Sequence, residues 1–135
     1  MLSAIWRASV ASGTTPEAFD MLLAHLPETP CAVRLEGLAD SGGRLCRASG
    51  FNYVVSEGPE MSDVLDDIVT FLASVRPLLD SLPVSLGFSS ELDLGFGVGG
   101  DAHFTRTVRF SPQILAGLAS CSITLAVSGY PSSDD

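Results

Sequence analysis

The densest group of side chains that could do chemistry is a run of carboxylates in the middle of the chain. A pair of carboxylates can act as general acid and base when a cleft holds them together. Carboxylates can equally form an acidic docking surface for a basic protein, or a solvated face that suits the positive end of a helix. The spacing leaves the last two interpretations open, and a structural role at a helix start is the simpler one. The candidate partner-binding residues are Glu57, Glu60, Asp63, Asp66 and Asp67.

A glycine-rich run, Gly95-Phe96-Gly97-Val98-Gly99-Gly100, could hold a nucleotide phosphate. That function requires a helix to follow the glycines, because the phosphate binds to helical N–H groups. Residues 103–110 alternate between apolar and polar side chains, which is typical of a strand. The run therefore predicts a hairpin turn, and we expect no cofactor.

The histidines and cysteines form no ligand pattern. Cys31, Cys46 and Cys121 make no C-x-x-C pair, and neither His25 nor His103 lies at a metal-site spacing from them. We expect buried free thiols in a reducing compartment. The sequence therefore predicts no catalytic residues, no metal site and a non-enzymatic protein. An unrecognised enzyme is the least favoured alternative.

The element that must position the carboxylates is an amphipathic segment from Met61 to Leu82. Ser62 is a good N-cap, and the aspartates that follow suit the helix dipole. Pro77 should end or kink the helix, since it lacks an N–H and crowds the preceding turn. The main helix is then nearer Ser62 to Val75, with a second short piece from Leu78 to Leu82. Its predicted core stripe is Leu65, Ile68, Leu72, Val75 and Leu79.

Segments on both sides of this helix predict the rest of the fold. Two further helices start at Thr15-Pro16-Glu17 and Ser111-Pro112-Gln113, where a hydroxyl precedes a proline. A turn at Asp40-Ser41-Gly42-Gly43 joins two strands into a hairpin. The strand predicted at 103–110 places Arg106 on an apolar face, either next to a carboxylate or at a sheet edge. The predicted strands are 4–11, 31–38, 44–56, 84–96, 103–110 and 122–127.

The resulting order is β-α-β-β-α-β-β-α-β. Its first six elements form a split βαβ, ferredoxin-like pattern, and the remaining β-α-β extends the same sheet. We expect an α+β fold with a mainly antiparallel sheet and helices on one face. Residues 1–130 should form a single domain, and residues 131–135 a flexible polar tail.

The charge balance bears on possible partners. The net charge is −9, from sixteen acidic residues against seven basic ones, and every basic residue is an arginine. Such a chain repels nucleic acid and favours a basic protein partner, although solubility alone would also explain the charge. We see no signal peptide and no apolar run long enough for a membrane span, so a cytoplasmic location without membrane binding is predicted. Pairing of exposed sheet edges leaves a homodimer open.

Two stretches resemble a bacterial family. One is Tyr53-Val54-Val55-Ser56-Glu57 with the acidic helix after it. The other is Phe110-Ser111-Pro112-Gln113-Ile114-Leu115-Ala116-Gly117-Leu118-Ala119, followed by Ile123-Thr124-Leu125-Ala126-Val127 and a terminal Tyr130. Together they resemble a family of small bacterial domains of about this length and of unknown function. The chain departs from that family in having Ala126 and Ser128 where acids are usual, and in lacking a glycine-proline segment after the first helix.

Small acidic bacterial domains of this kind also resemble the immunity proteins of polymorphic toxin systems. The resemblance implies a protein that neutralises a cognate, often cationic, toxin domain by direct contact. The alternative that the sequence leaves open is a small-ligand-binding or regulatory module, with a pocket between the sheet and the Met61 helix.

Overall fold

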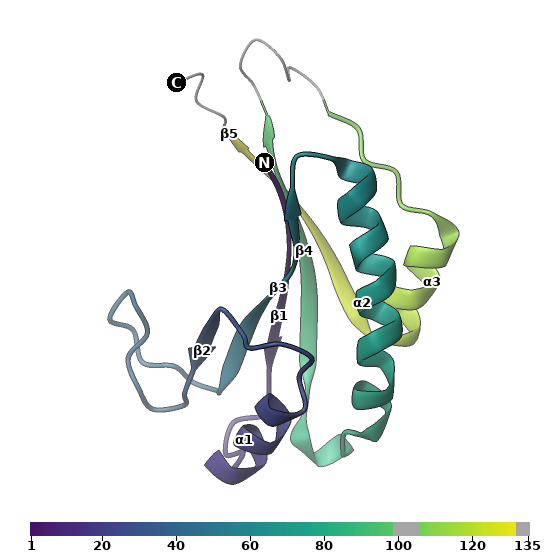
Figure 1. The fold of residues 1–135 in the computed structure, drawn as a ribbon. Coiled ribbons are helices and arrows are strands. Elements are labelled where there is room, and N and C mark those ends of the chain that lie inside the picture. The colour runs from purple at the N-terminus through teal and green to yellow at the C-terminus, as the bar shows by residue number, and fades with distance from the viewer. Residues whose placement is uncertain (99–105, 132–135) are drawn as a thin grey trace.

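The computed structural model describes residues 1–98 and 106–131, which form one five-stranded sheet and three α-helices. The order of strands across the sheet is β2-β3-β1-β4-β5 (Figure 1). The elements are β1 (Leu2–Ser9), α1 (Pro16–Ala24), β2 (Ala32–Arg34), β3 (Gly50–Gly58), α2 (Met61–Ser81), the short 3₁₀ helix η1 (Val84–Leu86), β4 (Ser89–Val98), α3 (Pro112–Ser120) and β5 (Ile123–Pro131).

The sheet has the predicted α+β character. β1 pairs antiparallel with β3 and β4, and β2 pairs antiparallel with β3. This arrangement of the first four strands is compatible with a ferredoxin-like core. β5 extends the sheet by pairing parallel to β4, and α3 forms the connection between the two strands. Of the expected β-α-β extension, the helix and the last strand are present, and β4 takes the place of the predicted additional strand.

The central strand β1 separates two different faces. Its alternate residues Leu2, Ala4, Trp6 and Ala8 are buried, and the residues between them are half-buried. α2 and α3 cover the buried face, and α1 lies at the end of the sheet, beside the last turn of α2 and η1 (Figure 1). An antiparallel sheet tolerates one solvated face when its side chains alternate in this way.

Aromatic rings form the centre of the core between the sheet and α2. The ring centroid of Trp6 lies 5.1 Å from that of Phe51, 5.9 Å from Tyr53 and 5.0 Å from Phe71, all edge-to-face. The buried stripe of α2 is Val64, Ile68, Phe71, Leu72 and Val75, while Leu65 and Leu79 are only partly buried. The predicted stripe is confirmed at Ile68, Leu72 and Val75. It missed Val64 and Phe71, because the helix turns Phe71 toward the aromatic rings of the sheet.

Two of the three helix starts agree with the prediction. The Thr15 hydroxyl accepts a hydrogen bond from the Ala18 N–H, and the Ser111 hydroxyl accepts one from the Ile114 N–H. The prediction for α2 was wrong: Ser62 lies inside the helix, and the N-cap is Glu60, which has no side-chain capping bond. The start moves to Met61 because that side chain packs against the core.

The predicted break at Pro77 was also wrong, since α2 continues through this residue to Ser81. Pro77 and Ala73, whose carbonyl loses its helical partner, are both exposed. Water can therefore hydrate that carbonyl. Leu78 and Leu79 pack against the core and hold the last turn in place.

The predicted hairpin of strands 31–38 and 44–56 is present only in parts. β2 and β3 pair at their ends, but residues 35–49 leave the sheet. Gly37 has a left-handed φ of 82°, which ends the extended backbone. The predicted turn is present, since the Asp40 N–H donates to the Arg44 carbonyl at 2.8 Å and Gly43 has φ 80°. Leu38 and Leu45 are exposed there, so no burial draws the segment into the sheet.

The strand expected at 84–96 begins instead at Ser89, after η1 and a left-handed turn at Gly87. The strand expected at 103–110 is wrong where it can be seen: residues 106–110 have no regular structure, and residues 99–105 lie outside the described range. Both sides of β4 are already occupied, by β1 and β5. A returning strand thus has no position beside β4, and Arg106 lies on no strand face.

We expect Trp6→Ala to lower the free energy of unfolding by about 3–5 kcal/mol, because it opens a cavity under α2. Trp6→Phe should cost less, since it keeps a ring and removes the indole N–H, which has no hydrogen-bond partner. Urea unfolding followed by far-ultraviolet circular dichroism measures both. An equal loss in the two variants would contradict this account of the core.

Candidate functional site

The predicted carboxylates form one surface at the junction of β3 and α2, which we call the acidic surface. It consists of Glu57, Glu60, Asp63, Asp66 and Asp67. All are exposed, and none forms a salt bridge with a basic residue of the described ranges. Asp63 lies in the first turn of α2, where the dipole stabilises a negative charge by about 0.3–1 kcal/mol. Of the other four, Glu57 lies in β3, Glu60 is the N-cap, and Asp66 and Asp67 lie beyond the first turn.

Asp67 differs from the others because it also has a structural contact. Its Oδ2 accepts a hydrogen bond of 2.6 Å from the hydroxyl of Ser56, a buried residue of β3. This bond joins the start of α2 to the end of β3. It also fixes one carboxylate oxygen of the acidic surface toward the sheet.

Next to Asp67, the surface is hollowed between β3 and α2. This β3–α2 hollow has a volume of about 300 Å³. Polar groups and aromatic rings line it together. Its lining residues are Pro27, Glu28, Tyr53, Val54, Val55, Asp67, Thr70, Phe71 and Ser74.

The electrostatics of the β3–α2 hollow favour a positive guest. Burial raises the pKa of the Tyr53 hydroxyl, and the charge of Glu28 adds to this, so the phenol stays neutral at ordinary pH. The Tyr53 and Phe71 rings lie 5.8 Å apart. The carboxylates of Asp67 and Glu28 suit a guanidinium or ammonium group through charge-assisted hydrogen bonds, while the Tyr53 and Phe71 rings, only 5% and 6% exposed, form the floor beneath them.

Sequence reasoning found Asp67 but missed Glu28 and Tyr53. Glu28 lies in the loop after α1, far along the chain from the other acids. Tyr53 was predicted only as a strand residue. No local signal could have connected them, because the β3–α2 hollow exists only where three separate segments meet.

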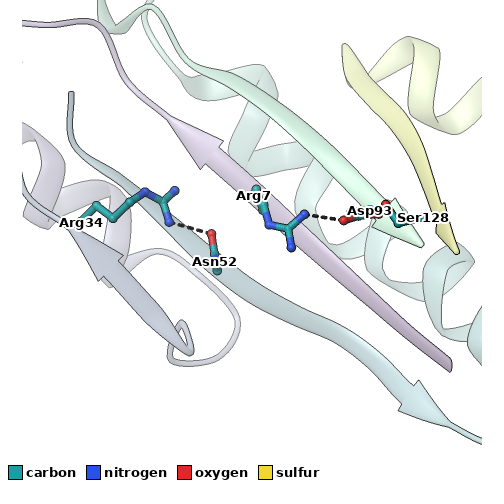
Figure 2. A network of polar contacts seen from close by, with 5 residues as sticks. All are labelled: Arg7, Arg34, Asn52, Asp93 and Ser128. Atoms are coloured by element: carbon teal, nitrogen blue, oxygen red, sulfur yellow. Dashed lines mark hydrogen bonds and ion pairs between the residues drawn. The ribbon is translucent and has the colours of Figure 1, made fainter. Parts of the chain in front are cut away.

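A second group of polar residues lies on the open face of the sheet (Figure 2). Asp93 is only 6% exposed and accepts hydrogen bonds from Arg7 and, at 2.8 Å, from the hydroxyl of Ser128. The bond to Asp93 raises the pKa of the Arg7 guanidinium above its ordinary value. Arg34 donates to the Asn52 side chain at 2.8 Å. Both guanidinium groups are therefore engaged within the chain, so this network is a structural one.

A larger groove than the β3–α2 hollow lies elsewhere, between α2 and α3, and has a volume of about 460 Å³. Leu72, Ala73 and Gly117 contribute to its mainly apolar wall, and Arg76 and Gln113 supply polar groups. The nearest carboxylate oxygen of Asp80 is 3.8 Å from Arg76 Nε, and both side chains are exposed. The groove could hold a small ligand with an apolar body and an anionic end.

The histidines and cysteines lie apart from these surfaces. His25 Nδ1 is 2.7 Å from the Met21 carbonyl oxygen, and His103 lies outside the described residues. The cysteines are free, but the expectation of buried thiols was wrong: Cys31 is exposed, and Cys46 and Cys121 are partly exposed, because they lie in loops and at a helix end. Within residues 1–98 and 106–131, no three metal-binding side chains come together.

Comparison with known proteins adds no relative. No family model, curated protein or solved structure matches the chain. None of the helices in the described ranges has the length and apolarity needed to cross a membrane. Fold and site together define an α+β domain with an acidic surface at the start of its main helix and a hollow beside the middle of that helix.

Arg7→Ala should lower the free energy of unfolding by about 1–3 kcal/mol, because it leaves the shielded carboxylate of Asp93 with a single hydrogen bond. Ser128→Ala keeps the ion pair and should cost only about 0.5–1.5 kcal/mol. Urea titration of both variants measures the difference. If Arg7→Ala proved the milder change, the ion pair would not be what stabilises the open face.

Proposed function

We propose that the protein is a non-enzymatic binding protein that docks a basic protein partner on its acidic surface. The β3–α2 hollow carries this proposal, because it brings Asp67 of the acidic surface together with Glu28 and two aromatic rings. An arginine or lysine of the partner would enter it. Side chains anchored in such pockets supply much of the affinity of protein complexes.

Long-range charge supports the same proposal. The chain carries a net charge of −9, and the acidic surface gathers exposed carboxylates near the start of α2, with Asp67 reaching the hollow. A negative surface of this kind speeds the encounter with a basic partner and repels acidic competitors. Helix-dipole stabilisation explains Asp63 and the N-cap Glu60 but not Glu57 of β3.

The partner class that we propose is a cationic toxin domain, with the protein acting as its immunity protein. Charge, size and the resemblance noted in the sequence support this choice. The test is co-expression with the product of the adjacent open reading frame, followed by a pull-down and a growth-rescue assay. Neither a complex nor rescue would count against an immunity role.

Once a partner is captured, charge reversal on the acidic surface tests the docking site. Glu57→Lys/Asp66→Lys should slow association by about tenfold at low salt, because it reverses the steering field. Glu17→Lys/Asp20→Lys on α1 is the matched control: both doubles change the net charge by the same amount, and all four positions are exposed. Stopped-flow or surface-plasmon measurements give the rates. Equal slowing by both doubles would show a general charge effect and no local site.

A second arm of the same experiment tests the hollow. Asp67→Asn removes the charge but keeps an oxygen that can accept the hydrogen bond from the Ser56 hydroxyl. Glu28→Gln removes the second carboxylate charge, in the loop after α1. The double variant should speed dissociation by about tenfold or more, since a buried charge pair affects mainly the off-rate. An unchanged off-rate would place the anchor of the partner elsewhere.

A second candidate function is small-ligand binding in the groove between α2 and α3. Its volume of about 460 Å³ and the weakly paired Arg76 favour an apolar anion such as a fatty or aromatic acid. Thermal-shift screening against such acids should raise the melting temperature with dose. Arg76→Gln should remove the shift. A flat screen would argue against this function.

A further inference from the structure

The outer edge of the sheet at β5 has no partner among the described residues. β5 runs from Ile123 to Pro131 and pairs on one side only, with β4. The backbone N–H and C=O groups on its other side are therefore available to another strand. A long free edge of this kind is a template for pairing with a further chain unless the protein protects it.

The two edges of the sheet are treated differently. At the opposite edge, β2 has only three residues and ends at Arg34, after which the chain leaves the sheet. A short edge strand with a charge is a common protection against pairing. β5 has nine residues and carries neither a charge nor an internal proline. The edge at β5 is thus the one that is open to pairing.

Charge indicates what pairs there. From Ser111 to Pro131 the chain contains no Asp, Glu, Lys, Arg or His, although the whole chain has a net charge of −9. A basic partner would gain nothing at a neutral strip. A second copy of this acidic chain can approach closely only at a neutral strip, because contacts between like charges cost several kcal/mol. The acidic surface at β3 and α2 lies on the far side of β1 and β4 from this edge.

Apolar side chains extend the edge on its helical side. Gly117 of α3 faces α2, since a Cβ there would lie 3.0 Å from Leu72 Cδ1. Ile114 and Leu118 face the core. Helical spacing then turns Leu115 away from α2, toward the outer edge of the sheet, where it is 48% exposed. Val127 of β5 is 49% exposed as well.

We propose that two copies of this chain pair through β5 as an antiparallel, two-fold symmetric dimer with a continuous ten-stranded sheet. A two-fold axis perpendicular to the sheet places the helical layers of both copies on the same side. The Leu115 side chains then approach one another and are covered. Full-length pairing of β5 centres on Val127, which lies opposite Val127 of the second copy at a Cβ separation of about 4.5–5.5 Å.

The test is the mass in solution, by sedimentation or light scattering across a concentration series. The native protein should reach twice the 14.1 kDa of one chain. Val127→Glu places two carboxylates opposite each other and should raise the dimer dissociation constant about a hundredfold. Val33→Glu is the matched control, the same change at a side chain that is 46% exposed on β2, at the opposite edge of the sheet, and it should remain dimeric. Circular dichroism checks that both variants are folded.

A mixing experiment tests the symmetry of the pairing. Val127→Lys should be monomeric alone, and an equimolar mixture with Val127→Glu should restore the dimer through opposite charges across the axis. A native protein that stays monomeric at every concentration, or a dimer that Val127→Glu leaves intact, overturns the proposal. Monomeric variants without rescue on mixing overturn the two-fold register. The double variant Glu57→Lys/Asp66→Lys should still form the dimer. The test of the dimer is therefore independent of the proposed docking site.

Discussion

The packing of Trp6 is the constraint on which the rest of the structure depends. Its indole lies in the central strand and contacts aromatic rings from both β3 and α2. The contact with Phe71 sets the rotation of α2, and that rotation decides which of its side chains face the core and which face water. The acidic start of the helix is exposed for this reason. The indole N–H is left without a partner, so apolar contact outweighs the cost of that unsatisfied group.

Competition for the sides of β4 is the second constraint. β1 occupies one side and β5 the other, so residues 106–110 lead into α3 without pairing in the sheet. This parallel β4–α3–β5 unit carries the neutral strand to the outer edge of the sheet. The topology therefore separates a charged surface at β3 and α2 from an uncharged edge at β5.

That separation gives the two proposals a common physical basis. A charged surface favours a partner of opposite charge, and a neutral edge with free backbone groups favours a copy of the same chain. Both surfaces can be occupied at once, because β1 and β4 lie between them. In the proposed dimer, each copy would present its acidic surface to a basic partner independently.

The sequence by itself determined the α+β class, the helix starts at Thr15 and Ser111, and the run of carboxylates near the start of α2. Each depends on neighbours within a turn or two of the chain, so local propensity decides it. Only the tertiary structure decided where α2 begins, that it passes through Pro77, and that residues 106–110 form no strand. These depend on which side chains reach the core and which strands already flank β4. The β3–α2 hollow belongs to the same group, because Glu28, Tyr53 and Asp67 come together only when three distant segments pack.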